Sequence, residues 1–208
     1  MQNVCKIEVG KIVKIGVMAL QGAVMEHIRS LEECGVEAVL VKTKSDLQNI
    51  DGLIFPGGES TTMRKLIDRF DLLIPLKQFA ESGKPMFGTC AGLILLARNI
   101  QDQDSHHIGV LEATVERNSF GRQVNSFETI LEIQGVAADF PAVFIRAPHI
   151  VDVGKSVEIL ATHENRIVMA RQDNILGCSF HPELTNDHRI TAYFIQMVQE
   201  SLAKQVNL

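Results

Sequence analysis

The sequence has little that would attract a nucleic acid or a membrane. Its 208 residues carry 20 basic and 25 acidic side chains, a formal net charge of −5 at pH 7. Nucleic acids and anionic membranes select for clustered Lys and Arg, so this balance favours neither as a partner and fits a small neutral or mixed-charge substrate better. The longest apolar stretch, "FGTCAGLILLA" at residues 87–97, is interrupted by Gly, Thr and Cys. It is far shorter than the roughly 20 residues of a membrane helix.

Metal motifs, redox motifs and export signals are also missing. The four cysteines lie too far apart for a Cys-x-x-Cys motif, and the seven histidines show no His-Glu-x-x-His spacing, so we expect no metal and no cofactor. The start of the chain, "MQNVCKIEVGK", has no apolar signal core. We therefore expect a cytoplasmic protein in a reducing compartment, in which disulfides are rare and each thiol is judged singly.

In the first half of the chain, short β-branched runs alternate with amphipathic helical patterns. This alternation is typical of βαβ units and predicts a parallel sheet covered by helices. The expected strands are Lys14–Leu20, Ala38–Val41, Gly52–Phe55 and Pro85–Thr89, and the expected helices are Met25–Gly35, Ser60–Phe70 and Leu73–Gly83.

The second half changes character, because strands follow one another quickly and predict an added antiparallel portion. A final amphipathic helix is expected from Asp187, which helps to cap it, to Lys204. The fold class predicted is thus α/β, with a three-layer, mostly parallel sheet flanked by helices. Residues 1–12 precede the first clear strand and are expected to be an N-terminal extension, with residues 13–208 forming a single domain. The antiparallel strands expected are residues 127–133, 142–147, 157–163, 166–172 and 175–180.

One cysteine stands between two glycines where a predicted strand feeds straight into a predicted helix. Gly88-Thr89-Cys90-Ala91-Gly92 is the cysteine version of the nucleophile elbow, a sharp turn that exposes the side chain above the sheet. The glycines leave room in a crowded turn, and the helix N-terminus favours a thiolate. Most free cysteines are small buried hydrophobic residues, and we expect this of Cys34 and Cys178. For Cys90 the flanking glycines favour a nucleophile.

A thiol nucleophile needs a base and a group that orients the base. The segment "SFHPEL" offers both, because His181 ends a predicted strand and Glu183 follows two residues later. In extended backbone these positions project to the same side, so the carboxylate can meet the imidazole. An isolated His-Pro-Glu would suggest a surface histidine and a solvated glutamate, but with an elbow cysteine it becomes a candidate triad.

The segment "FPGGES" supplies a third element, a strand end followed by two glycines and a helix. Gly57 and Gly58 can turn their amides toward a substrate, and Ser60 or Thr61 can cap the helix. An N–H from this loop together with the amide of Ala91 would form an oxyanion hole for acyl transfer.

Taken together, these motifs resemble class I (triad) glutamine amidotransferases. The strings "ALQGA", "PGGESTTM", "GTCAGLILLA", "VERNSFGRQ", "FIRAPHI" and "GCSFHPELT" are similar, more narrowly, to the PdxT/SNO family of glutaminase subunits of pyridoxal 5′-phosphate synthase. The resemblance runs from about Lys14 to the last helix, and implies a flavodoxin-like sheet.

The resemblance implies roles for particular residues. Cys90 would attack the side-chain amide of L-glutamine, His181 held by Glu183 would move the proton, and a γ-glutamyl thioester would be hydrolysed to glutamate after ammonia leaves. Oxyanion donors would be Gly58 and Ala91. The implied glutamine-binding residues are Gly57, Gly58, Glu59, Ser60, Arg117, Ile145 and Arg146. Two arginines and a glutamate suit the carboxylate and ammonium of free glutamine.

The resemblance also implies a partner, because ammonia released in water is quickly protonated and has to be handed on. That partner would be a (β/α)8-barrel synthase subunit, in a large heteromeric complex, which condenses a pentose phosphate, a triose phosphate and ammonia into pyridoxal phosphate. Gln21 and Gly22, in the first βα loop, are expected at the interface.

Three other interpretations remain. Another class I amidotransferase or a γ-glutamyl hydrolase would share the triad, but the strings "GGESTTM" and "ERNSFGRQ" disfavour both. Cysteine hydrolases and chaperones of the DJ-1/PfpI type share the elbow but lack the trailing His-Pro-Glu. A binding module with an inactive triad is disfavoured because all three triad residues are intact.

We expect His106 and His107, in a polar loop, to be solvated.

Overall fold

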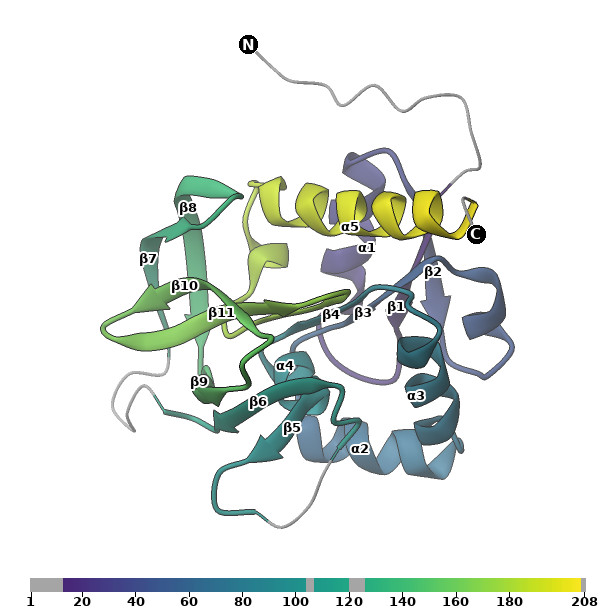
Figure 1. Ribbon diagram of the computed structural model, residues 1–208, viewed down its shortest axis with the longest axis horizontal. Helices are drawn as coiled ribbons and strands as arrows, with labels where there is room; N and C mark the ends of the chain where they lie inside the picture. Colours follow the sequence, from purple (N-terminus) through teal and green to yellow (C-terminus); the bar gives the residue numbers. More distant parts are fainter. Residues whose placement is uncertain (1–12, 104–106, 120–125, 207–208) are drawn as a thin grey trace.

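The fold is built around a ten-stranded sheet with the strand order β2-β1-β3-β4-β12-β11-β9-β6-β5, in which β10 pairs with β11. A computed structural model describes residues 13–103, 107–119 and 126–206 (Figure 1). The expected extension at 1–12 and His106 lie outside these ranges, and a single domain over 13–208 stays a prediction. The helices are α1 (Val24–Glu33), α2 (Ser60–Arg69), α3 (Leu73–Glu81), α4 (Ala91–Leu96) and α5 (Arg189–Val206), with 3₁₀ turns η1 (Asp46–Asn49) and η2 (Pro182–Leu184). The strands are β1 (Lys14–Met18), β2 (Glu37–Val41), β3 (Gly52–Phe55), β4 (Met86–Thr89), β5 (Ala97–Ile100), β6 (Leu111–Glu116), β7 (Ser126–Ile133), β8 (Ala137–Ile145), β9 (His149–Val153), β10 (Glu158–His163), β11 (Arg166–Gln172) and β12 (Ile175–Cys178).

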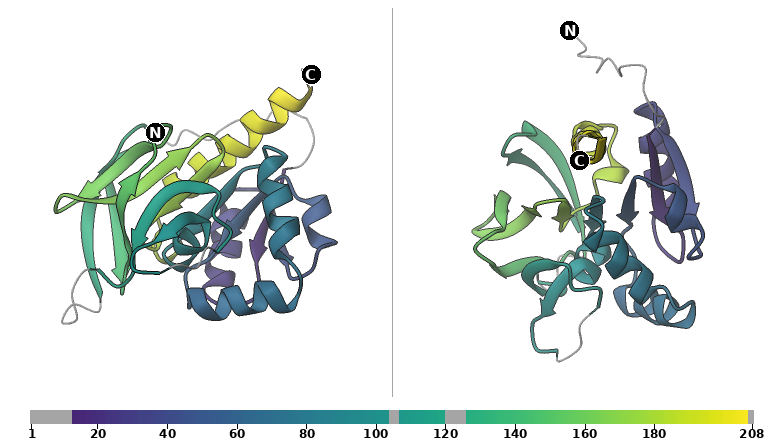
Figure 2. Two further views of the ribbon diagram at one scale, coloured as in Figure 1. Left: turned by 60° about the horizontal axis from the view of Figure 1, so that its bottom comes forward. Right: turned by 45° about the vertical axis from the view of Figure 1, so that its right-hand side comes forward.

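Strands β2, β1, β3, β4 and β12 form a continuous parallel part of the sheet, and β5 and β6 pair parallel at its other end. Helices α1 and α5 cover one face, and α2 and α3 cover the other (Figures 1 and 2). Successive side chains of β3 alternate between the two faces: Ile54 packs in the cluster that contains α1 and α5, while Leu53 and Phe55 pack in the cluster that contains α2 and α3. A strand covered on both faces is apolar throughout, which is why β3 and β4 were predictable as short continuous apolar runs. The predicted fold class is confirmed.

The second half departs from the sequence prediction in detail. β7 and β8 form a separate two-stranded antiparallel sheet, and β10 and β11 pair antiparallel as expected. β9 also pairs antiparallel with β11. β12, however, pairs parallel with β4 and belongs to the parallel part. β5, β6 and β9 were not predicted. β5 begins directly after α4. The apolar run from Leu93 to Ala97 therefore resembles one continuous helix, and the sequence does not show where the helical repeat gives way to the two-residue repeat of a strand.

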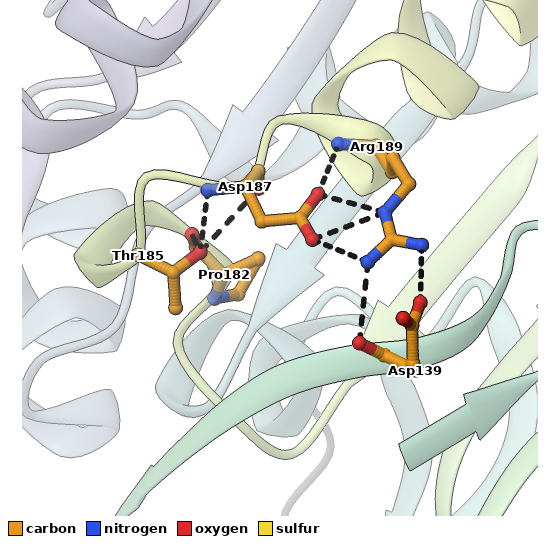
Figure 3. A network of polar contacts seen from close by, with 5 residues as sticks. All are labelled: Asp139, Pro182, Thr185, Asp187 and Arg189. Atoms are coloured by element: carbon orange, nitrogen blue, oxygen red, sulfur yellow. Dashed lines mark hydrogen bonds and ion pairs between the residues drawn. The ribbon is translucent and has the colours of Figure 1, made fainter. Parts of the chain in front are cut away.

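The last helix begins two residues later than predicted, and a polar network holds its start in place (Figure 3). Asp187 accepts a hydrogen bond from the Arg189 backbone N–H at 3.0 Å, as a capping residue does. The Arg189 guanidinium also bonds Asp139 of β8 at 2.7 Å, and the Thr185 hydroxyl donates to the Pro182 carbonyl at 3.0 Å. The network therefore joins the turn η2 to α5 and to β8. In the described ranges every helix is too short or too polar to cross a lipid bilayer.

Candidate active site

Four parallel strands, β1, β3, β4 and β12, end at one edge of the sheet, where α/β proteins bind their ligands. The loops that follow these ends surround a cavity of about 200 Å³. Its lining contains Gln21, Gly58, Glu59, Ser60, Cys90, Ala91, Ile94, Arg117, Asn118, Ile145, Arg146 and His181. Most of the residues singled out from the sequence therefore share one cavity, although they are spread over 160 positions of the chain.

Cys90 sits at a sharp turn between β4 and α4. Its backbone has φ 49° and ψ −102°, a conformation that residues other than glycine rarely adopt. The turn brings backbone very close to both flanking glycines: a Cβ at Gly92 would lie 2.1 Å from the Phe55 carbonyl oxygen, and one at Gly88 would lie 2.4 Å from the Gly92 carbonyl carbon. The predicted elbow geometry, including the reason for its glycines, is thus present.

His181 and Glu183 form a tight pair beside this turn. The Cys90 N–H donates to the Cys178 carbonyl at 2.8 Å, so the end of β12 lies directly beside the elbow. Three residues further on, His181 Nδ1 lies 2.8 Å from Glu183 Oε1, and both side chains are at least nine-tenths buried. The sequence argument assumed extended backbone here, but Glu183 belongs to the turn η2. The pairing is as predicted, although the local conformation is not.

The charges of this group favour a protonated imidazole. Burial opposes protonation of His181, but hydrogen bonds and charge interactions with Cys90 and Glu183 outweigh it and raise its pKa to about 10. Burial likewise opposes the charge on Glu183, yet the contacts with His27 and His181 leave its pKa below the ordinary value. An imidazolium beside a thiol stabilises negative charge on sulfur, the form that attacks a carbonyl. By contrast, burial raises the pKa of the Cys178 thiol well above its usual value, as suits a structural residue.

The Gly-Gly-Glu-Ser loop is held in place by the loop after β1. The Glu59 N–H donates to Gln21 Oε1 at 2.8 Å, and the Ala23 N–H donates to the Gly57 carbonyl at 3.1 Å. Gly22 has φ +105°, and a Cβ there would lie 1.9 Å from the Gly57 carbonyl oxygen. The two loops are therefore packed against each other and joined by hydrogen bonds.

The structure differs from the sequence expectation in where Gly57 lies and in how α2 is capped. Gly57 is absent from the cavity lining and packs under the imidazole instead, since a Cβ there would lie 2.3 Å from His181 Cε1. Neither Ser60 nor Thr61 caps α2, because Glu59 occupies the cap position without a side-chain hydrogen bond. Ser60 lines the cavity, and its buried hydroxyl lacks a hydrogen-bond partner among the described residues.

The second half of the chain supplies four more lining residues, Arg117, Asn118, Ile145 and Arg146. Arg117 and Asn118 follow β6, and Arg146 follows β8 with a φ of 43°. The Ile145 carbonyl oxygen lies 3.8 Å from Cys90 Sγ. Both candidate glutamine-binding arginines are thus within the cavity that contains the thiol.

Sequence reasoning missed four residues at the site and misplaced one elsewhere. Ile94 and Asn118 line the cavity, while His27 and Thr89 lie beneath the triad pair. His27 could have been noticed as a polar residue on the apolar face of its helix, because Ile28 and Leu31 flank it there. His107, which was expected to be solvated, is only 5% exposed. Among the described residues, no cluster of three or more His, Cys, Asp or Glu side chains is placed to bind a metal ion.

The fold and this constellation are those of a triad glutamine amidotransferase, with a cysteine elbow beside a paired histidine and glutamate. Comparison with known proteins agrees. Residues 17–200 match the model of the SNO glutamine amidotransferase family, and the chain belongs to that family.

Curated relatives and solved structures support the assignment. The pyridoxal 5′-phosphate synthase subunit PdxT of Anoxybacillus flavithermus is 65% identical over 190 residues, covering 91% of this chain and 99% of the relative. PdxT of Bacillus thuringiensis is 60% identical over 195 residues, covering 94% and 100%. A crystal structure of a glutamine amidotransferase superposes with a TM-score of 0.85 at 45% identity, over 89% of this chain and 98% of that one. PurLQS of Thermotoga maritima, at 17% identity, shares the fold with a TM-score of 0.66 over 94% and 100%. The resemblance seen in the sequence is confirmed.

Proposed function

We propose that this chain hydrolyses L-glutamine to L-glutamate and ammonia, as the glutaminase subunit of a pyridoxal 5′-phosphate synthase. The observation that carries the proposal is the common cavity of Cys90 and His181, with Glu183 paired to the imidazole at 2.8 Å. The relatives named as synthase subunits match nearly the whole chain, which supports this acceptor over that of another amidotransferase or of a γ-glutamyl hydrolase.

The reaction follows from the charges at the site. The Cys90 thiolate attacks the side-chain amide carbon of glutamine, and a carbon–sulfur bond forms as the carbonyl electrons move to oxygen. The amides of Ala91 and Gly58 stabilise this oxyanion. His181 gives its proton to the departing nitrogen, so ammonia leaves and a γ-glutamyl thioester remains. His181 then takes a proton from water, which attacks the thioester and releases glutamate together with the thiolate.

The rest of the cavity selects free glutamine. Arg117 and Arg146 supply positive charge for the α-carboxylate, and Glu59 supplies negative charge for the α-ammonium. The Ser60 hydroxyl and the Ile145 backbone add hydrogen-bonding groups beside the amide, and Gly57 keeps the imidazole in place from below. Side chains of both charges in one cavity suit a zwitterionic amino acid.

The ammonia goes to a synthase partner, which we propose to be a (β/α)8 barrel in a large heteromeric complex within the cytoplasm. We assign Gln21 and Gly22 to the interface, because their loop is locked to the Gly-Gly-Glu-Ser loop beside the nucleophile. A partner bound at Gln21 and Gly22 would therefore act on the loop that carries the oxyanion donor Gly58. A Gln21→Ala variant is expected to weaken both docking and activated turnover; if neither changes, the interface assignment is wrong.

The test of the function is glutamate release by the purified chain, with and without a candidate synthase barrel, beside a Cys90→Ala variant. We expect release that the barrel accelerates and that the Cys90→Ala variant lacks. Glutamate release by the Cys90→Ala variant would refute the mechanism. Release that is equally fast with and without the barrel would refute the proposed partner.

A further inference from the structure

A second histidine lies beneath the triad pair, and the mechanism above does not use it. His27, on α1, is 2% exposed, and its Nε2 atom lies 3.5 Å from Glu183 Oε2 and 3.2 Å from the Thr89 hydroxyl. Glu183 therefore lies between two histidines, with Oε1 facing His181 at 2.8 Å and Oε2 facing His27. We propose that His27 is a positioning residue, whose neutral imidazole donates its Nε2 hydrogen to Glu183 and fixes the carboxylate for pairing with His181.

The burial of Glu183 supports this assignment. Its side chain is 0% exposed, and Oε2 is a buried atom that has no conventional hydrogen-bond partner among the described residues. A carboxylate oxygen in such surroundings is costly unless a donor faces it. His27 Nε2 is the side-chain nitrogen that faces this oxygen.

The same contact determines which nitrogen of His27 carries the hydrogen. If Nε2 were unprotonated, its lone pair would face the negative oxygen, and both would repel. With the hydrogen on Nε2, the ring can share it between Glu183 and the Thr89 hydroxyl, which is fully buried on β4 immediately before Cys90. Burial and the charge on His181 lower the pKa of His27, while Glu183 and Glu26 oppose this, and the net lowering favours the neutral ring.

The assignment rests on the proposed glutaminase function, because a positioning residue is defined by the reaction it supports. Without His27, the carboxylate would lose the donor that faces Oε2 and could rotate about its terminal bond. His181 would then be less well oriented between Cys90 and the leaving group, which affects the chemical step and leaves glutamine binding unchanged.

Two variants of nearly equal shape separate a donor from a space-filling residue. His27→Gln retains an N–H group at similar reach, whereas His27→Met fills the space without one. In the complex with the synthase partner, we expect His27→Met to lower kcat roughly 10- to 100-fold with KM within about twofold. We expect His27→Gln to stay within about fivefold of the wild type. His188→Met is the matched control, because His188 also ties α1 to the protein, through Ser30 at 3.0 Å and Glu33 at 2.7 Å, without contacting the triad.

A measurement that needs no activity accompanies the kinetics. Long-range ¹H–¹⁵N correlation spectra of histidine-labelled protein identify the tautomer of His27, whose signals are assigned by their loss in His27→Gln. We expect a neutral ring with hydrogen on Nε2. Hydrogen on Nδ1 alone, equal kcat values for the Met and Gln variants, or an effect confined to KM would each overturn the proposal. A wild-type complex that releases no glutamate would instead refute the proposed function, while the spectra would still decide the hydrogen bond.

Discussion

Placing a methyl group at Gly57 should displace the imidazole of His181 while all three triad residues are retained. A Cβ built there lies 2.3 Å from His181 Cε1 and 2.9 Å from Nδ1, whereas ordinary contact begins near 3.4 Å. In the Gly57→Ala variant the ring must therefore move by about 1 Å, and a misplacement of that size in an active site costs about 10²-fold in rate. The movement also strains the 2.8 Å hydrogen bond to Glu183. We expect kcat for glutamate release to fall roughly 100-fold or more.

The start of β3, the strand that leads into the Gly57 loop, provides the control. A Cβ at Gly52, where β3 begins, would lie 2.6 Å from Val198 Cγ2 in the core, away from the cavity. Gly52→Ala should therefore lower the melting temperature while leaving kcat near the wild-type value. The assay is glutamate release with the synthase partner, together with thermal unfolding of each variant. A folded Gly57→Ala protein whose kcat stays within about threefold of wild type would refute the reasoning.

Three further predictions concern charge. Glu183→Gln should lower kcat roughly 10²- to 10⁴-fold, and because Glu183 raises the pKa of His181, the histidine titration followed by NMR should move to lower pH; an unmoved titration would contradict this. Burial, aided by Arg64 and Arg117, lowers the pKa of His107 to about 4, so unfolded chains bind a proton there between pH 6.5 and 4 that folded chains do not. The free energy of unfolding should therefore decrease as the pH falls through that window, and His107→Gln should make this decrease smaller by about 1–2 kcal/mol, measured by chemical denaturation at pH 7.5 and 4.5. An equal decrease in the variant and the wild type would contradict this. Arg189→Ala removes partly exposed ion pairs, and should cost roughly 0.5–1 kcal/mol of unfolding free energy; a loss above about 3 kcal/mol would show that the network in Figure 3 is worth more than surface pairs.

The features that could be predicted from the sequence are those encoded by neighbouring residues. β3 begins and ends where the apolar run Gly52–Phe55 predicts, and the elbow at Cys90 follows from its glycines and from the change from strand to helix. The loops after β1, β3 and β4 were predictable as neighbours, because parallel strands end at a common edge of the sheet. The pairing of His181 with Glu183 was predictable from chemistry, since a thiol nucleophile needs an oriented base.

The features that were missed depend on contacts between distant segments. β12 lies parallel to β4 because of the whole sheet order, which no local pattern contains. Nine described strands of the main sheet separate His27 from Glu183 along the chain, and only folding places their side chains 3.5 Å apart. His107 looked solvated because its neighbours are polar, yet Ile108 is almost fully buried and carries it inward.

The most direct test of the central claim is to identify the atom that reacts with glutamine. Incubation of the complex with an electrophilic glutamine analogue, followed by peptide mass spectrometry, locates the covalent adduct among the four cysteines. The account predicts a single adduct on Cys90, suppressed by excess glutamine and absent from the Cys90→Ala variant. An adduct on Cys5, Cys34 or Cys178 that glutamine suppresses, with Cys90 unmodified, would contradict it.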